Sequence, residues 1–420
     1  VELAGGARFP AAGYGAAFAW LVGGTLVVGA LFGPLARGLR PFDGRFPSLR
    51  LARARLGDAT SRHRLAAAGL YVAVAMAAAM SVLVGSFART MEEWIEVRFQ
   101  ADVFLSSRAV SSMGQEFLLE PAVIEAIAAR PEVAEVDPFR VLPIDLEGKR
   151  TYLGASRHDL LAGRQKVLWL DAPATELAEA TPATPVAYVN EAFVARFGWG
   201  QGAMVEVPTP SGRETVRITG VFADYGDEQG LLWIDWPVFG AWFDSDAATN
   251  LSLFLTPGTD ALVAAEALEA SFPGLAARDN RTLRELVRRT FRQTFAITEA
   301  LKVIGIAVAV GGLALALSNL LRESRRELRT LRTLGCTRRE IARATAFESL
   351  GIACVGLGGG LLASIALGAL LVFVINKQSF GWTLRWALPW HEFALLALGT
   401  AVMAMTVGYF VGRRQGRLLE

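Results

Sequence analysis

The sequence predicts a membrane α-helical protein with about five transmembrane helices and one inserted α+β extracytoplasmic domain. The 420-residue chain is 53% hydrophobic, and its mean hydropathy is +0.36. Five apolar runs are each long enough to cross a bilayer, which needs about 20 residues. Between the second and third runs, residues 88–295 alternate short strand and helix patterns instead.

The same hydropathy pattern sets the expected boundaries. The chain begins without Met and without a recognisable signal peptide, so we expect it to be the C-terminal repeat of a longer protein. The predicted segments are: the end of an upstream repeat with its transmembrane helix at 1–36; a basic cytoplasmic linker at 37–64; transmembrane helices at 65–87, 296–321, 345–375 and 391–412; the outer domain with its stalk at 88–295; cytoplasmic helices at 322–344; an outer loop at 376–390; and a cytoplasmic tail at 413–420.

Charge supports this topology. Residues 37–64 hold eight Arg against two Asp, residues 320–350 hold eight Arg against four Glu, and the tail adds Arg413, Arg414 and Arg417. The outer loop has only Lys377 and Arg385. Residues 88–295 contain 30 acidic and 19 basic residues, a net charge of −11. Basic residues mark the cytoplasmic side of membrane proteins. The positive charge therefore indicates membrane orientation and no nucleic-acid partner.

The linker at 37–64 has two interpretations. Pro41, Gly44 and Pro47 favour turns in its first part. Ser48 is then placed to cap a short helix that carries Leu49, Leu51 and Leu56. Either this helix lies in the membrane plane as an elbow before the next span, or the stretch is a simple basic linker.

The outer block reads as strands and helices in alternation. We predict strands within 101–107, 187–190 and 250–256, helices within 121–130, 190–199 (capped by Asn190) and 261–270, and hairpins within 133–156 and 204–225. The first hairpin turns at Glu147-Gly148-Lys149. We predict a helix over residues 278–292, called the stalk helix below, with Arg281, Arg284, Arg288 and Arg292 on one face.

No catalytic, metal or cofactor site is predicted. The three His residues are far apart in sequence, the phosphate-binding pattern GxxxxGK[ST] is absent, and neither Cys lies in the outer block. Two clusters there have structural interpretations: the acids Asp224, Asp227 and Glu228 as a solvated turn, and the aromatics Trp233, Trp236, Trp242 and Phe243 as core.

The last two spans carry few charges. The run 345–375 is longer than a bilayer is thick, so it must tilt, bend at 356–360 or project beyond the membrane. Its single acid, Glu348, is placed to contact the basic cytoplasmic segment or to lie unpartnered at the interface. In the predicted span at 296–321, Glu299 and Lys302 are spaced to form an ion pair near its start. Trp382, Trp386 and Trp390 are predicted to form an interfacial belt.

The cytoplasmic segment between two spans combines four signals. Leu328, Leu331 and Leu334 form an apolar stripe on a basic helix. Gly335 suits the left-handed turn that ends a helix. Thr337 and Glu340 then have the spacing of a capping box that starts a second helix. A basic loop that only sets topology needs neither the stripe nor the box.

The stretch RRELRTLRTLGCTRREI (325–341) resembles the coupling segment of FtsX-like permeases, the membrane subunits of MacB-type ABC transporters. The placement of the outer block, with VNEAFVARFGWGQGAMVEV (189–207) and VRITGVFADY (216–225), resembles the periplasmic core domain of the same permeases. The resemblance implies a separate cytoplasmic ABC ATPase that binds ATP, and an ATPase-coupling surface made of Arg325, Arg326, Glu327, Leu328, Leu331, Arg332, Leu334, Gly335, Thr337, Arg338, Arg339, Glu340 and Ile341.

The implied function is that of a bacterial inner-membrane transporter subunit that is not itself an enzyme. Its implied partners are the ATPase, an upstream permease half or second permease subunit, membrane lipid and an extracytoplasmic protein. Because the spans carry few polar residues, we expect it to export or extract a lipid, lipoprotein or amphiphile, or to transmit force. The alternative is an ATP-independent receptor or scaffold whose outer domain binds a partner. A membrane hydrolase would need the catalytic constellation that the sequence lacks.

Overall fold

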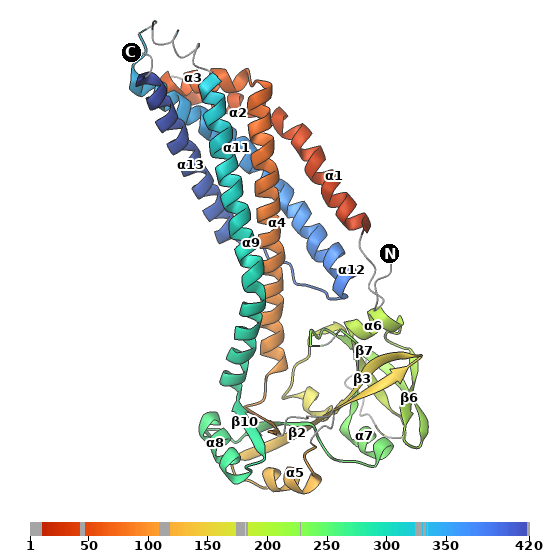
Figure 1. Cartoon of the computed structure of the whole chain (residues 1–420). Helices are drawn as coiled ribbons and strands as arrows, with labels where there is room; N and C mark the ends of the chain where they lie inside the picture. The colour runs from red at the N-terminus through yellow and green to blue at the C-terminus, as the bar shows by residue number, and fades with distance from the viewer. Residues whose placement is uncertain are drawn as a thin grey trace. The chain divides into compact units, whose positions relative to one another are not determined.

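The computed structural model describes residues 11–42, 47–108, 118–173, 181, 184–226, 228–323, 330, 333 and 335–417. The chain divides into two compact units. The sheet unit comprises residues 1–8, 90–294 and 377–383, and the helix unit comprises residues 9–89, 295–376 and 384–420. Figure 1 shows the elements with their labels.

Within the described residues, four helical segments are long and apolar enough to span a membrane: Ala11–Phe42, Ser61–Arg98, Arg338–Ser379 and Trp390–Arg414. The first segment comprises α1 (Ala11–Val28), η1 (Gly29–Leu31), α2 (Phe32–Gly38) and η2 (Arg40–Phe42), and the second is α4 (Ser61–Arg98). The third comprises α11 (Arg338–Leu370), a π-helical turn (Leu371–Ile375) and α12 (Asn376–Phe380). The fourth is α13 (Trp390–Arg417). The predicted span at 296–321 is helical as part of α9 (Asn280–Glu323). Most side chains of that stretch, including Glu299 and Lys302, lie outside the described ones.

Glycines of α11 bring it into close contact with α4. A Cβ added to Gly356 would lie 2.8 Å from the carbonyl oxygen of Ala67, and one added to Gly360 would lie 2.9 Å from that of Tyr71. Small residues four apart allow the backbones of membrane helices to approach in this way. The helix is continuous through this stretch, without a break at 356–360. The glycines serve packing instead, and the irregular turn lies further on, at Leu371–Ile375.

The basic linker contains a helix, α3 (Pro47–Gly57), which supports the elbow interpretation over a simple linker. Its Ala52 and Leu56 are buried, with Leu56 in a cluster that includes Ile352 and Ala353 of α11. The predicted cap was wrong: α3 begins at Pro47, which favours the first helical position because it lacks an N–H, and Ser48 therefore lies inside the first turn.

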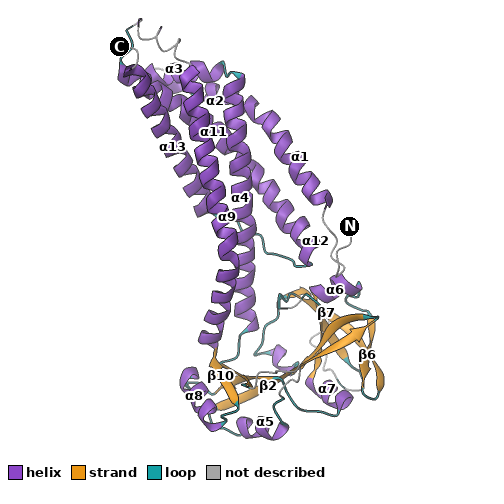
Figure 2. Ribbon diagram, in the orientation of Figure 1, coloured by secondary structure: helices purple, strands orange, loops and turns teal. Residues whose placement is uncertain are grey.

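The sheet unit contains all ten described strands, drawn in orange in Figure 2. Their order is β10-β1-β9-β2-β3-β8-β5-β7-β4, with β6 pairing β7. The bounds are β1 Val103–Ser107, β2 Val133–Leu146, β3 Lys149–Ser156, β4 Trp169–Asp171, β5 Val186–Asn190, β6 Met204–Thr209, β7 Gly212–Phe222, β8 Leu231–Asp235, β9 Asn250–Leu255 and β10 Leu275–Asp279.

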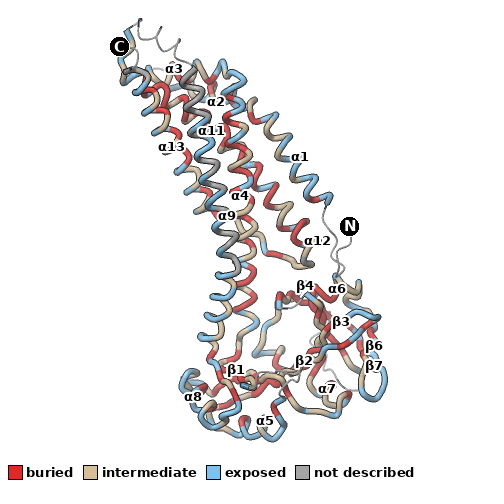
Figure 3. The backbone as a smooth tube through the Cα atoms, in the orientation of Figure 1, coloured by how far each residue is buried: buried red, intermediate tan, exposed pale blue. Residues whose placement is uncertain are grey.

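The long strand β2 joins two hydrophobic cores. Its first half pairs with β9 and its second half with β3. One core lies under α5 (Pro121–Ala128) and α8 (Ala261–Ser271) and contains Leu251 and Leu253 of β9. The other lies beside α6 (Glu191–Phe197) and α7 (Trp236–Phe243) and contains Leu153 and Ile218. In Figure 3 many of the buried positions of the unit, drawn in red, lie along its strands.

The predicted elements of the outer block are confirmed, including both hairpins and the Asn190 cap, whose side chain accepts the Phe193 N–H at 3.0 Å. Strands β8 and β10 and helix α7 were not predicted from the sequence. Asp235 caps α7 by accepting the Trp236 N–H, and Pro237 follows at an early helical position, which together are a recognisable start signal.

The stalk helix packs on the end of α4 inside the sheet unit. Arg288 pairs with Glu92, and Arg284 donates to the carbonyl oxygens of Glu96 and Phe99. Arg292 pairs instead with Glu285 of its own helix. The arginine face therefore binds chiefly within the protein.

The three tryptophans of the predicted interfacial belt have different surroundings. Trp382 packs edge-on against Tyr225 of the sheet unit, with ring centroids 5.6 Å apart. Trp386 stacks on Phe373, while Trp390 is 67% exposed. An interfacial role stays a prediction for Trp386 and Trp390, but Trp382 has a packing role.

Candidate functional site

The structure describes part of the predicted coupling surface. Gly335, Thr337, Arg338, Arg339, Glu340 and Ile341 lie within the described residues, whereas Arg325, Arg326, Glu327, Leu328, Leu331, Arg332 and Leu334 lie outside them. Gly335 has φ of +94°, the left-handed conformation that glycine adopts without strain. The left-handed conformation predicted for Gly335 is therefore present.

The predicted capping box forms at the start of α11. The Thr337 hydroxyl accepts the Glu340 N–H at 3.3 Å, and the Glu340 carboxylate accepts the Thr337 N–H at 2.8 Å. Both bonds satisfy amides that have no partner within the helix. The next residue, Ile341, is only 1% exposed. The start of α11 is therefore stabilised by the capping box, and its first apolar side chain is buried.

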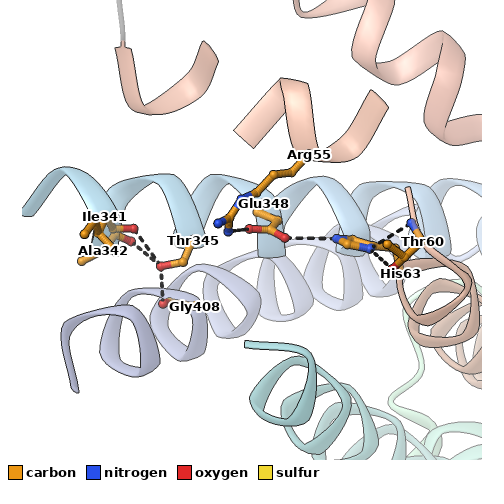
Figure 4. A network of polar contacts seen from close by, with 8 residues as sticks. All are labelled: Arg55, Thr60, His63, Ile341, Ala342, Thr345, Glu348 and Gly408. Carbon is orange, nitrogen blue, oxygen red and sulfur yellow. Dashed lines mark hydrogen bonds and ion pairs between the residues drawn. The ribbon is translucent and has the colours of Figure 1, made fainter. Parts of the chain in front are cut away.

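Seven residues further along, Glu348 lies at the centre of a buried polar cluster (Figure 4). One carboxylate oxygen accepts from Arg55 Nη1 of α3 at 2.9 Å, and the other lies 3.0 Å from His63 Nε2 of α4. The Thr60 N–H donates to His63 Nδ1 at 3.3 Å, which assigns the proton of the neutral ring to Nε2, facing Glu348. Glu348 is 1% exposed, so its charge is compensated inside the protein.

A second contact joins α11 to α13. The hydroxyl of Thr345, which is fully buried, donates to the carbonyl oxygen of Gly408 at 3.0 Å (Figure 4). A Cβ added to Gly408 would lie 2.9 Å from Cα of Ala346, so only glycine allows this approach. We call Arg55, Thr60, His63, Thr345, Glu348 and Gly408 the polar junction.

The polar junction cross-links α3, α4 and α13 to the first turns of α11. The sequence pattern singles out Glu348 as the lone acid of its run but does not bring His63 to it, because the two are 285 positions apart. The described partners of Glu348 are Arg55 and His63, whereas its suggested contact with the basic coupling segment stays a prediction, because most of that segment lies outside the described residues. A lone acid in an apolar run was the available signal, since such a group needs a partner.

The other clusters that we considered in the sheet unit have structural roles. Asp224 accepts from Trp94 Nε1 at 3.0 Å, while Asp227 lies outside the described residues. Among the described residues, no group of three His, Cys, Asp or Glu side chains is arranged to hold a metal ion. Trp242 is buried in the core, and Trp236 and Phe243 pack against it. The core interpretation is confirmed for these three aromatics, whereas Trp233 lines a cavity.

Comparisons with known proteins cover most of the chain. Residues 300–418 match the family described as FtsX-like permease C-terminal, and residues 65–271 match the MacB-like periplasmic core domain. The chain is 28% identical over 442 residues to an uncharacterized ABC transporter permease protein, Rv0987, of Mycobacterium tuberculosis. That match covers 98% of this chain and 51% of the relative, so the chain spans about half the relative's length.

Two solved structures are also similar. The periplasmic region of MacB from Actinobacillus actinomycetemcomitans has a TM-score of 0.34 at 11% identity, covering 45% of this chain and 94% of that one. The extracellular domain of the noncanonic ABC-type transporter YknZ from Gram-positive bacteria has a TM-score of 0.31 at 12% identity, covering 42% and 99% respectively. With one family match on the sheet unit and another on the following membrane helices, the chain belongs to the FtsX-like, MacB-type family of ABC transporter permeases.

Proposed function

We propose that this protein is a multi-pass permease subunit in a bacterial cytoplasmic membrane that converts ATP hydrolysis on a separate ABC ATPase into movement of its outer domain. The coupling surface at 325–341 would dock on the ATPase, and a second permease half or subunit would complete the transporter. Family membership and the concentration of Arg on one side of the predicted membrane support this proposal.

The polar junction is the observation that carries the mechanism. The coupling segment ends at a capped helix start, and Thr345 and Glu348 follow within the next three turns or so. Moving α11 alone would separate the Glu348 carboxylate from Arg55 and His63 and expose each to an apolar environment. Because such separation is costly, α3, α4 and α13 should move together with α11. A push at Thr337 would therefore reach several membrane helices at once.

The cargo that we favour is a lipid, lipoprotein or amphiphile, with force transmission to an extracytoplasmic protein as the other use of the same movement. The buried side chains of α11 are mostly Ala, Gly, Ile and Val, which is poor lining for a hydrophilic path. An ATP-independent receptor would also use the outer domain, but it would not need a capped coupling helix.

The test is co-purification of the full-length protein with candidate ATPases, in which the apolar stripe is changed by Leu331→Asp/Leu334→Asp. We expect the double change to remove ATPase binding, because two carboxylates would replace the apolar contact. The matched control is Arg413→Glu/Arg414→Glu, which changes exposed charges at the end of α13 and should leave binding intact. If no ATPase binds the unchanged protein, the receptor alternative takes the lead.

A further inference from the structure

The strands β10-β1-β9-β2 pack one face on α5 and α8 and present the other face to a cavity. On the cavity face, Arg278, Phe104, Ser252 and Asp137 are direct cross-strand neighbours in one row. The next row contains Ser106, Asn250 and Phe139. All seven line a cavity of about 370 Å³, within the range of roughly 300–1,000 Å³ typical of ligand pockets.

Six aromatic side chains contribute to the lining of the cavity. Besides Phe104 and Phe139, these are Trp94 and Phe99, at the end of α4, and Phe222 and Trp233, from β7 and β8 of the same sheet. The indole N–H of Trp94 donates to Asp224, and that of Trp233 donates to Ser156 at 2.9 Å. The rings therefore present carbon surface to the cavity, while their polar atoms are satisfied by the protein.

Asp137 is the buried acid of the cavity, at 5% exposure. Its carboxylate oxygens accept from the Arg157 N–H at 3.0 Å and from Gln165 Nε2 at 2.6 Å. Burial raises the pKa of Asp137 to about 6. Since both oxygens already have donors, this carboxyl group does not require a ligand cation.

Charge at the rim is positive. Arg98, Lys166 and Arg278 line the cavity and are exposed. Arg98 also stacks over the Phe139 ring, with its guanidinium carbon 5.5 Å from the centroid. The acids in the lining are the buried Asp137 and the half-buried Asp224, both already hydrogen-bonded. An apolar interior with cations at its mouth is complementary to a chain with an anionic head.

We propose that this cavity binds a single-chain anionic amphiphile, with its hydrocarbon chain between the aromatic walls and its carboxylate or phosphate head at Arg98, Lys166 and Arg278. Phe104 and Ser252 form the floor beneath the chain. As a cargo site, the assignment rests on the proposed transport function. Ligand binding, however, is measured without any ATPase, so failure of one proposal is distinguishable from failure of the other.

The test uses the full chain in phosphatidylcholine nanodiscs and radiolabelled laurate, with binding to empty nanodiscs subtracted. We expect saturable binding that tightens about fourfold for each methylene added between decanoate and laurate. Lys166→Gln/Arg278→Gln should weaken it about five- to tenfold. Acetate should not compete, which separates an amphiphile site from a simple anion site.

Ser252→Trp fills the floor of the cavity and should abolish saturable binding. Leu262→Trp, at an exposed position of α8 outside the cavity, is the matched control and should bind as the unchanged protein does. If Ser252→Trp does not fold, Asn250→Trp in the neighbouring row replaces it. Absence of saturable binding, binding unaffected by both cavity-filling changes, or tighter binding of dodecyltrimethylammonium than of laurate would each overturn the proposal.

Discussion

The ion pair at the centre of the polar junction leads to a quantitative prediction. Glu348→Gln keeps the shape of the side chain and an oxygen for the His63 Nε2–H, but it removes the negative charge from beside Arg55. Arg55→Met leaves the buried carboxylate with His63 alone among its described partners. Each single change therefore leaves one charge without its partner in this ion pair, whereas the double change removes both charges.

The expected magnitude follows from burial. Removing one member of a buried ion pair costs about 3–5 kcal/mol. The side chain of Glu348 is 2% exposed and that of Arg55 is 14% exposed, so we place each single change at the lower end, about 3 kcal/mol of unfolding free energy. The double change strands no charge and should also cost only about 3 kcal/mol, which gives a coupling energy of about 3 kcal/mol between the two residues.

The assay is equilibrium unfolding of the four proteins in mixed micelles, followed by helical circular dichroism. Arg343→Met is the matched control, because Arg343 is exposed on the same helix and its removal should change stability by less than about 0.5 kcal/mol. Strict additivity of the two single changes would refute the reasoning, because it would mean that Arg55 and Glu348 do not compensate each other.

Three further predictions test other parts of the molecule. Burial lowers the pKa of His158 from 6.5 to about 3, so the unfolded chain alone binds this proton in that window; stability should fall by about 1.4 kcal/mol per pH unit as the pH is lowered from 6.5 towards 3. Burial raises the pKa of Asp137 from 3.8 to about 6, so this group gives the opposite slope of stability against pH between those values. In an Asp137→Asn background, His158→Phe should therefore remove the loss of stability at low pH, measured by urea unfolding. An unchanged slope after His158→Phe would contradict the role of His158. Gly360→Ala should destabilise the packing of α4 on α11 by about 1–3 kcal/mol in thermal unfolding, whereas Gly358→Ala, with open space around it, should not. Thr337→Ala should cost about 1 kcal/mol and speed hydrogen exchange at the start of α11, while Thr337→Ser should restore protection.

Local signals predicted much of the fold because they depend on neighbours in sequence. The capping box at Thr337, the left-handed Gly335 and the Asn190 cap each involve residues within a few positions, and all three are present. Hairpins are similarly local, since the turn fixes the register of both strands. The role of the coupling surface itself stays a prediction, and the structure describes only its second half.

Predictions that depended on distant partners were less successful. For the long run that holds Gly356 and Gly360, the sequence left a tilt, a bend or a projection open, whereas the structure shows that α4 lies close enough to need these glycines. Glu348 was noted as the lone acid of its run, but neither Arg55 nor His63 could be assigned to it from sequence spacing. Strands β8 and β10 are short, and their pairing partners lie far away in the chain.

The sequence by itself determined the class of protein, the positions of its membrane helices and the family, because hydropathy, charge asymmetry and caps are properties of contiguous residues. Tertiary structure alone decided which helices share the polar junction and which strand face lines the cavity. Arg278, Phe104, Ser252 and Asp137 become one row only when four strands from distant parts of the chain pair in register. A buried charge such as that of Glu348 is likewise compensated only by partners that folding brings next to it.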